Sequence, residues 1–226
     1  MRHAMLMFNH LKWLNRIKPC ALCQSTWFKH QQTSLCFECW QQLNIKPSTI
    51  QQRGITIQVA TSYQFPIDRL IQQFKYQQAL HHSVIFNDVL SRLNIPQVQA
   101  VVPMPISSQR LQQRGYNQAY LLAQLIARPR QLPIWMPIER VHAEQQKNLD
   151  RSERIQNIEA QFVIQAKNKI RYRRVLIIDD VVTTGSSIYA LKNKLHNLGC
   201  HQVHVICIAH AAGFKPMHAG PDLGSD

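Results

Sequence analysis

Val175 to Ser187 read V-L-I-I-D-D-V-V-T-T-G-S-S, a short apolar run followed by two carboxylates and a turn rich in hydroxyl groups. The first four residues are apolar and three of them are β-branched, which is typical of a strand buried in a parallel sheet. We expect that strand to end at Asp179 and Asp180. A helical pattern then runs to Leu198, and Gly199 ends it as a glycine after a helix commonly does. This strand-turn-helix pattern indicates an α/β fold.

The turn after the two acids carries groups suited to binding an anion such as phosphate. In open α/β sheets ligands bind at the carboxyl ends of the strands, and the N-terminus of a helix attracts anions. The two carboxylates suit ribose hydroxyls, directly or through a divalent cation. We therefore predict a site for a ribose 5-phosphate. The alternative is a plain connection in which one Ser or Thr caps the helix, which would account for one hydroxyl group only. The turn residues are Thr183, Thr184, Gly185, Ser186 and Ser187.

This segment resembles the phosphoribosyl-diphosphate (PRPP) signature of type I phosphoribosyltransferases. The resemblance implies that Asp179 and Asp180 contact the ribose hydroxyls, with Mg²⁺ accompanying PRPP, and that Thr183 to Ser187 hold the 5-phosphate. It also implies a parallel sheet with flanking helices.

The length and charge of the chain limit what else it can be. Its 226 residues allow one α/β domain and a small appendage, for which we expect boundaries at 1–50, 51–212 and a mobile tail at 213–226. The formal net charge of +14, from 26 basic and 12 acidic residues, favours polyanionic partners. A generally basic protein with no such partner is the alternative.

The chain has no recognisable membrane or export signal. No stretch approaches the ~20 apolar residues of a membrane span, and the first eighteen residues are interrupted by polar ones. That start fits a short amphipathic helix. We expect a cytoplasmic protein that is not an integral membrane protein.

Four cysteines near the N-terminus have the spacing of a zinc knuckle: Cys20, Cys23, Cys36 and Cys39. Two residues between thiolates let a tight turn direct both sulfurs at one ion, and the second pair completes a tetrahedron. We predict structural Zn²⁺ here, which would supply the folding energy of this short segment. Two disulfides are the alternative, disfavoured in a reducing compartment.

The middle of the chain alternates between predicted strands and helices. Residues 41–55 are polar and fit a linker. Apolar residues at helical spacing predict a helix from Ile67 to Phe74. The other expected elements are strands at Ile55–Tyr63, Ala100–Val102 and Gln202–Ala209 and helices at Val84–Leu93 and Ala119–Ala127.

Arg110 to Gln118 gather two arginines, a glycine, an aromatic residue and several amides just before a helix. This composition suits phosphate contact by Arg110 and Arg114, stacking of a base on Tyr116, and polar contact by Asn117. The alternative is a solvated basic loop whose tyrosine packs into the core. Lys75 is a further candidate for the pyrophosphate side.

Six motifs in one order resemble the ComF/GntX family, named for competence proteins of natural DNA transformation. They include the four cysteines, Phe74-Lys75-Tyr76, Val102-Pro103-Met104-Pro105, Arg114 to Gln118 and the PRPP signature. The sixth is Gln146-x2-Leu149-x4-Arg154, which lies where transferase folds carry a mobile flap; an exposed polar connection is the alternative. The resemblance implies a role in DNA uptake beside protein machinery at the inner face of the membrane.

Two functions remain open from the sequence. One is a protein of DNA uptake that binds single-stranded DNA and also PRPP or a ribose 5-phosphate unit. The other is an active phosphoribosyltransferase on a small-molecule or nucleobase acceptor, for which we find no segment that reads a base. A regulator that senses PRPP and binds duplex DNA ranks last, because no helix-turn-helix pattern is present.

Overall fold

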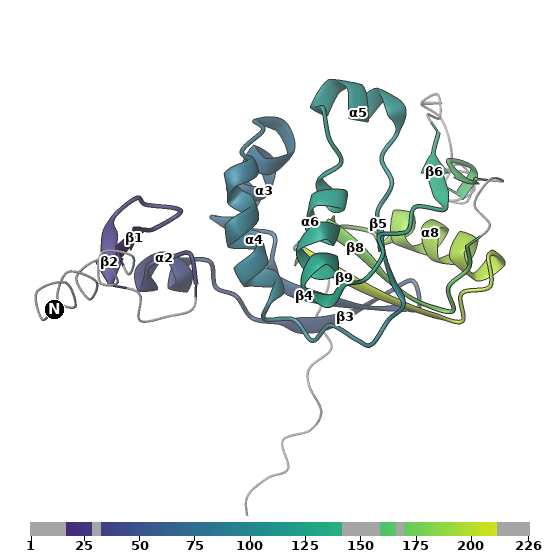
Figure 1. The fold of residues 1–226 in the computed structure, drawn as a ribbon, viewed down its shortest axis with the longest axis horizontal. Coiled ribbons are helices and arrows are strands. Elements are labelled where there is room, and N and C mark those ends of the chain that lie inside the picture. Colours follow the sequence, from purple (N-terminus) through teal and green to yellow (C-terminus); the bar gives the residue numbers. More distant parts are fainter. Residues whose placement is uncertain (1–16, 29–32, 142–158, 166–169, 212–226) are drawn as a thin grey trace, which may run out of the picture.

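The computed structural model describes residues 17–28, 33–141, 159–165 and 170–211, and a five-stranded sheet runs through its centre. The strand order is β3-β4-β9-β8-β5 (Figure 1). All neighbours are parallel except the pair β3 and β4. The strands are β3 (Ser48–Gln52), β4 (Ile55–Ser62), β5 (Ala100–Pro103), β8 (Arg174–Val182) and β9 (Gln202–His210).

The hairpin of β3 and β4 corrects the prediction of a linker at 41–55. Its two-residue turn, Arg53 and Gly54, has positive φ at both positions, as a tight hairpin with a right-handed twist requires. Ile50 and Gln52 point inward and are buried, while their neighbours are exposed. Only one side chain of this edge strand is apolar and buried, so its composition resembled that of a loop. The boundary predicted at residue 50 falls within β3.

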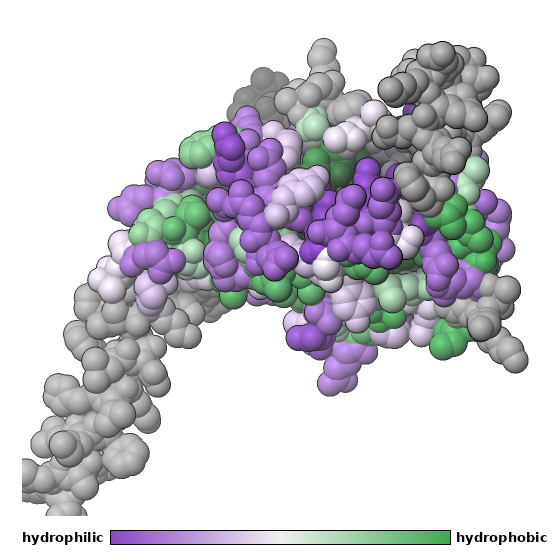
Figure 2. Space-filling view, turned by 90° about the horizontal axis from the view of Figure 1, so that it is seen from above, coloured by the Kyte–Doolittle hydropathy of each residue, from purple (hydrophilic) through white to green (hydrophobic). Residues whose placement is uncertain are grey.

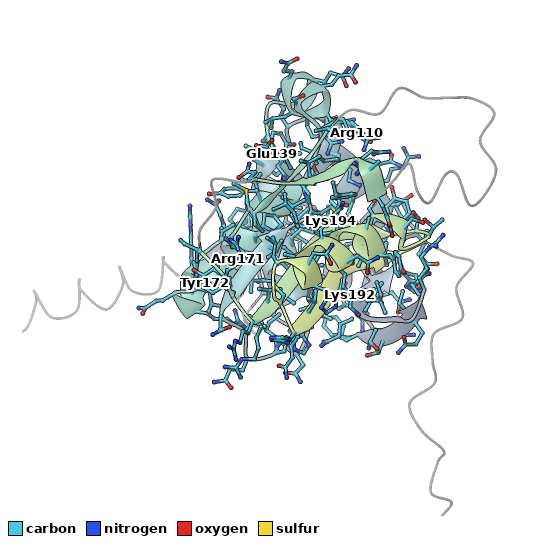
Figure 3. All side chains as sticks on the ribbon, turned by 90° about the vertical axis from the view of Figure 1, so that its right-hand side faces the viewer. Arg110, Glu139, Arg171, Tyr172, Lys192 and Lys194 are labelled. Atoms are coloured by element: carbon cyan, nitrogen blue, oxygen red, sulfur yellow. The ribbon has the colours of Figure 1, made fainter. Side chains whose placement is uncertain are left out.

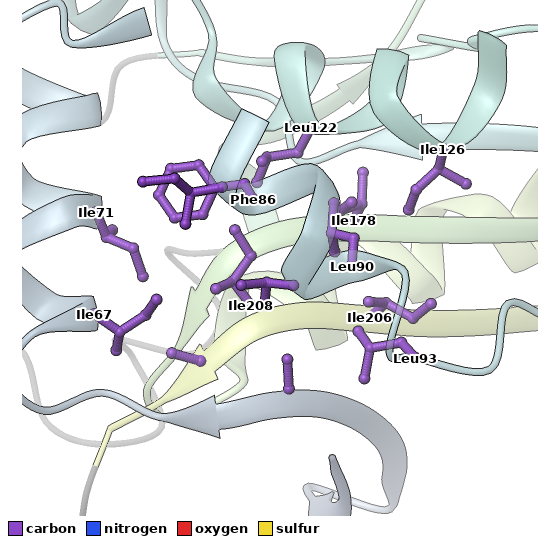
Figure 4. Packing of buried hydrophobic residues seen from close by; sticks show 14 of the residues in the cluster. Ile67, Ile71, Phe86, Leu90, Leu93, Leu122, Ile126, Ile178, Ile206 and Ile208 are labelled. Carbon is purple, nitrogen blue, oxygen red and sulfur yellow. The ribbon is translucent and has the colours of Figure 1, made fainter. Parts of the chain in front are cut away.

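Helices cover both faces of the sheet because its strands alternate apolar side chains between the two faces. On one face Leu176 and Ile178 of β8 pack with α3 (Ile67–Tyr76), α4 (Ser83–Leu90) and α6 (Gln118–Ala127) (Figure 4). On the other face Val175 and Ile177 pack with α8 (Ser186–Asn197). The result is a three-layered α/β domain with its core on both sides of β8 and β9.

Strand β8 is longer than predicted and contains both acids. Asp179 lies opposite Cys207, and Val182 lies opposite His210 on β9. The strand continues past the carboxylates because β9 offers backbone partners along its full length. Asp179 and Asp180 therefore lie within a strand whose successive side chains point to opposite faces of the sheet.

Smaller elements surround this core. Helix α5 (Ser108–Arg114) stands apart from the sheet (Figure 1), and Gly115 ends it with φ +82°. The predicted loop at Arg110 to Gln118 is thus mostly helical. The remaining elements are β6 (Ile138–Arg140) paired with β7 (Phe162–Ile164), the 3-10 turns η1 (Leu80–His82) and η2 (Arg128–Arg130), β1 (Ile17–Pro19) paired with β2 (Thr26–Phe28), and α2 (Phe37–Gln42).

The cysteine segment packs directly on the main domain. Cys20, Leu35 and Leu43 belong to the same apolar cluster as Leu90 and Leu93 beside α4. Asp88 Oδ2 of α4 accepts hydrogen bonds from the backbone N–H of Ser34 at 2.5 Å and from its hydroxyl at 2.6 Å. The guanidinium of Arg92 lies 5.0 Å from the ring centre of Trp40. The two parts therefore share one core.

The other predicted helices and strands are confirmed within a few residues, and α4 is shorter than predicted because it ends at Leu90. Among the described residues no helix is both long and apolar enough to span a lipid bilayer. The expected N-terminal helix and the tail at 213–226 lie outside the described residues.

The contact between Ser34 and Asp88 gives a first prediction. Asp88→Ala removes an acceptor that receives two hydrogen bonds at the junction of the cysteine segment and α4. We expect the free energy of unfolding to fall by about 1.5–3 kcal/mol, measured by urea denaturation. Glu38→Ala, which removes an exposed carboxylate from α2, is the control. Equal losses in both variants would contradict a specific role for this contact.

Candidate phosphoribosyl site and cysteine cluster

The two acids of β8 have different surroundings. Asp180 is 2% exposed, and its Oδ2 atom lies 2.9 Å from the ammonium nitrogen of Lys75 on α3. Burial is the largest single influence on Lys75 and by itself lowers its pKa. The charge and hydrogen bond of Asp180, with the added charges of Asp179 and Tyr76, together outweigh it, so the pKa is raised. The structure thus joins two residues that the sequence analysis had assigned to separate roles, Lys75 to pyrophosphate and Asp180 to ribose.

The carboxyl group of Asp179 has a raised pKa. Removal from water, reinforced by the adjacent charge of Asp180, raises the pKa of Asp179 to about 8. Its Oδ1 atom accepts a hydrogen bond from the backbone N–H of Asp180 at 2.9 Å. A bound cation or a nearby guanidinium would favour its ionised form, so this position can respond to a charged ligand.

The turn after β8 is held by the β3–β4 hairpin. Gln52 Nε2 donates to the Thr183 carbonyl at 3.2 Å, and Arg53 Nε donates to the Thr184 carbonyl at 3.3 Å. Gly185 has φ +71°, and a Cβ at this position would lie 3.0 Å from Cβ of Gln52. The close approach and the left-handed backbone therefore both require glycine here. Sequence reasoning missed Gln52 and Arg53, which are more than a hundred residues away.

The start of α8 offers polar groups to a ligand. Gly185 is the N-cap residue and supplies no capping side chain. The hydroxyls of Thr184 and Ser186 lie 3.0 Å apart, and the Ser186 N–H donates to the Thr184 hydroxyl. Thr183 and Thr184 are exposed. Exposed hydroxyls beside a helix N-terminus are suited to binding an anion.

Three predicted basic residues meet in one cleft. Lys75, Arg110 and Arg114 line a hollow of about 230 Å³ together with Tyr76, Gln78 and Gln113. The guanidinium of Arg114 lies 5.0 Å from the ring centre of Tyr76 and donates to Gln118 Oε1. Hydrophilic side chains predominate on the face that carries α5 (Figure 2). This cleft has the charge and the donors to hold phosphate groups.

Tyr116 and Asn117 are engaged with the protein itself. The Tyr116 hydroxyl donates to the Phe74 carbonyl, and its ring packs edge-on against Phe74 at 6.1 Å. Asn117 caps α6 by accepting from the N–H groups of Ala119 and Tyr120, and it donates to the Met104 carbonyl at 3.1 Å. These contacts give both residues a part in positioning the segment, and their contact with a ligand stays a prediction.

Arg140 joins the site although the sequence did not single it out. Burial lowers its pKa, as does the charge of Arg110, whereas the charge of Asp179 opposes that shift. Arg140 donates to Gln161 Oε1 at 3.2 and 3.1 Å, and its guanidinium lies 5.3 Å from the ring centre of Phe162. The sequence feature that could have identified Arg140 is its position at the end of β6, beside the predicted flap. The flap residues Gln146 and Arg154 lie outside the described residues.

A second hollow of about 700 Å³ borders this site. Tyr116, Tyr120 and Arg140 line it, together with apolar side chains that include Leu111 and Ile138. Its lining is more apolar than that of the basic cleft, which suits the ring of an organic ligand.

The four cysteine sulfurs gather where the knuckle spacing predicts. Every pair of Sγ atoms in Cys20, Cys23, Cys36 and Cys39 lies within 4.8 Å. The Sγ atoms of Cys23 and Cys36 are 3.7 Å apart, close to the ~3.8 Å edge of a tetrahedron with Zn–S bonds of ~2.3 Å. Cys20 Sγ accepts hydrogen bonds from the N–H groups of Leu22 and Cys36. All four cysteines are free thiols, so the group can hold a metal ion.

Comparison with known proteins agrees with this architecture. Residues 119–222 match the family model described as phosphoribosyl transferase domain. Competence protein F of Haemophilus influenzae is 34% identical over 159 residues, covering 65% of this chain and 69% of that protein. Competence protein ComFC of Bacillus subtilis is 30% identical over 105 residues, covering 46% and 41%. DNA utilization protein YhgH of Salmonella typhi is 27% identical over 164 residues, covering 66% and 69%.

These findings and the sheet topology confirm the predicted fold class. It is a type I phosphoribosyltransferase-like sheet with flanking helices, preceded by a four-cysteine segment that can hold a metal.

The cysteine cluster gives the second prediction. We expect one zinc ion per chain, measured by elemental mass spectrometry, and its loss in Cys39→Ser because one ligand is removed. Thermal unfolding of that variant should occur at a lower temperature, since metal binding contributes several kcal/mol to folding. Cys200→Ala, at a buried cysteine outside the cluster, should retain its zinc. Full zinc content in Cys39→Ser would contradict a four-thiolate site.

The Lys75–Asp180 pair gives the third prediction. Lys75→Met leaves the Asp180 carboxylate buried without a counter-charge, so the free energy of unfolding should fall by about 3 kcal/mol. The double variant Lys75→Met/Asp180→Asn should recover most of that loss, because it removes the unpaired charge. Chemical denaturation of both variants tests the coupling. Additive losses would show that the two side chains act independently.

Proposed function

The chain belongs to the ComF family of competence proteins, and from this we propose that it serves DNA uptake in natural transformation. In this proposal it binds single-stranded DNA and holds PRPP, or a ribose 5-phosphate unit, at the carboxyl edge of the sheet. Relatives named competence protein F and DNA utilization protein support the process. The resemblance further suggests action in the cytoplasm, beside uptake machinery at the inner face of the membrane.

The observation that carries the ligand assignment is the position of two acids near the end of β8, just before the turn that leads into α8, whose N-cap residue Gly185 has no side chain. Thr183 to Ser187 would bind the 5-phosphate through hydroxyls and the N-terminus of α8. Asp179 and Asp180 would accept hydrogen bonds from the ribose hydroxyls, and Asp179 would also face the Mg²⁺ that accompanies PRPP. Magnesium supplies charge neutralisation of the diphosphate. Gln52 and Arg53 hold the turn in place through its carbonyls.

The basic cleft would hold the diphosphate. Lys75, Arg110 and Arg114 line one hollow, and Lys75 also touches Asp180, so the cleft adjoins the proposed ribose site. An incoming diphosphate would compete with Asp180 for the Lys75 ammonium. Arg140 would add positive charge on the Asp179 side. Tyr116 and Asn117 would position the segment between α5 and α6.

An active phosphoribosyltransferase is the second candidate, favoured by the hollow of about 700 Å³ beside the site. A flat acceptor could occupy this hollow between its apolar walls. The reaction would break the bond from ribose C1 to the diphosphate oxygen and form a bond from C1 to an acceptor nitrogen, which then loses a proton. The basic residues would stabilise the leaving diphosphate by charge and position.

The fourth prediction concerns the pH dependence of PRPP binding. Because the pKa of Asp179 is about 8, this acid is mainly protonated at about pH 6.5 and mainly ionised at about pH 9. Affinity for Mg·PRPP, measured by calorimetry, should therefore rise several-fold over this range. Asp179→Asn should bind at least about tenfold more weakly with a flatter pH profile, while Glu38→Gln should match the unmodified chain. An identical profile in Asp179→Asn would exclude this role.

Two further measurements separate the candidates. Fluorescence anisotropy of labelled single-stranded DNA with zinc-loaded protein should show binding that weakens steeply between ~50 and ~200 mM salt. No binding at the lower salt would refute the DNA assignment. Release of pyrophosphate from Mg·PRPP in the presence of a nucleobase would favour the transferase, and its absence across all bases would leave PRPP as a bound ligand only.

A further inference from the structure

Five arginines gather at the amino end of the strands, opposite the proposed phosphoribosyl site. We call this surface the basic edge; it consists of Arg128, Arg130, Arg171, Arg173 and Arg174. Strand β8 begins at Arg174 and reaches Asp179 only five residues later, so the edge and the acids are separated by roughly 16 Å of extended chain. These side chains belong neither to the turn at Thr183 to Ser187 (the phosphate turn) nor to the cleft lined by Lys75, Arg110 and Arg114 (the basic cleft).

Contacts across neighbouring strands hold the basic edge together. The Gln99 side chain accepts hydrogen bonds from the N–H groups of Arg173 and Arg174, and the Arg173 carbonyl accepts from His201. Beyond β5, the Val101 N–H donates to the Pro133 carbonyl in the segment that follows η2. The ring of Trp135 in that segment packs edge-on against Tyr172 at 5.2 Å. The arginines of η2 and those at residues 171–174 are therefore parts of one surface.

The charge of this surface is of one sign. The three segments that form it, residues 127–134, 170–174 and 198–202, contain five arginines and no aspartate or glutamate. Arg128, Arg130, Arg171 and Arg173 are exposed and Arg174 is partly exposed. Figure 3 shows Arg171 and Tyr172 well apart from Arg110, which belongs to the basic cleft. A surface of this kind attracts a polyanion, and its location makes it separate from the phosphoribosyl site.

The chemistry of the surface favours nucleic acid over a lipid bilayer. All five cations are arginines, whose planar guanidinium groups form paired hydrogen bonds with phosphate oxygens. In the three segments Ile170 is the one large aliphatic side chain that is exposed, since Leu132 and Ile134 are half-buried and Leu198 is buried, so the surface offers little apolar area for insertion into a membrane. The arginines form two groups, one on η2 beyond β5 and one at the start of β8, so they are spread along the sheet and not around one point.

We propose that the basic edge is the track on which the phosphate backbone of single-stranded DNA binds, at a distance from the phosphoribosyl site. This proposal rests on the proposed function in DNA uptake and adds the surface that carries the strand. PRPP and the strand then bind at the same time, because they occupy opposite ends of β8.

The test compares two double variants that each remove two positive charges. Arg128→Gln/Arg173→Gln alters the basic edge, whereas Lys46→Gln/Arg69→Gln alters exposed residues elsewhere. Affinity for a labelled single strand of about 20 nucleotides is measured by anisotropy over a range of salt concentrations. We expect the first variant to bind about tenfold more weakly and its salt slope to fall by about 1.4, from two lost phosphate contacts. The second variant should stay within about twofold of the unmodified chain.

Controls distinguish failure of this inference from failure of the proposed function. Arg128→Gln/Arg173→Gln should keep its thermal stability and its Mg·PRPP affinity, and saturating Mg·PRPP should leave strand binding unchanged. If the unmodified chain binds no strand at ~50 mM salt, the proposed function fails and this inference with it. If it binds and the two variants behave alike, or if PRPP displaces the strand, the function stands and the basic edge is not the track. Loss of binding to phosphatidylserine vesicles, with strand binding intact, would instead assign the edge to a membrane.

Discussion

The contact between Lys75 and Asp180 connects the main parts of this structure. It joins α3 to the end of β8 at 2.9 Å, at a position where Asp180 is almost fully removed from water. A carboxylate at this depth requires a nearby cation, since an unpaired buried charge is costly. Helix α3 must therefore lie against the sheet in one register, with Ile67, Ile71 and Phe74 on its apolar side. The phosphate turn begins at Thr183, and its position depends on the same packing of α3 against β8.

A second constraint comes from the parallel arrangement of the sheet. Because helices cover both faces of a parallel sheet, ligands bind at the ends of its strands. The carboxyl ends of the strands carry the turn, the acids and the basic cleft. The β3–β4 hairpin, in which only β3 runs antiparallel to the rest of the sheet, brings Gln52 and Arg53 to the turn after β8. The amino ends of the strands carry the five arginines of the basic edge. One sheet thus presents two charged surfaces with different compositions.

The cysteine segment is tied to the same framework. Its buried residues join the apolar cluster on the α4 side, and Asp88 holds the backbone of Ser34. A metal ion in the cysteine cluster would thereby stabilise the packing of α4 as well as its own loop. The short cysteine segment therefore packs as part of the α/β domain and shares its core.

Local patterns in the sequence determined most elements and the cysteine cluster. The spacing of apolar residues predicted α3 and α6 because a helix repeats every 3.6 residues, and the cysteine spacing predicted the sulfur cluster because two tight turns suffice to form it. Polar strand β3 and helix α5 were missed, because their sequences resemble loops and their structure depends on neighbours.

Tertiary structure alone decided which distant residues meet. It set Lys75 against Asp180, placed Arg140 within reach of the charge of Asp179 and packed Gln52 against Gly185. It also gathered the arginines of η2 and of residues 171–174 at one end of the strands. These contacts arise from how separate strands and helices pack, and periodicity within a segment carries no information about its partner. The sequence by itself therefore determined the chemical groups available, and the packing of the sheet decided which of them act together.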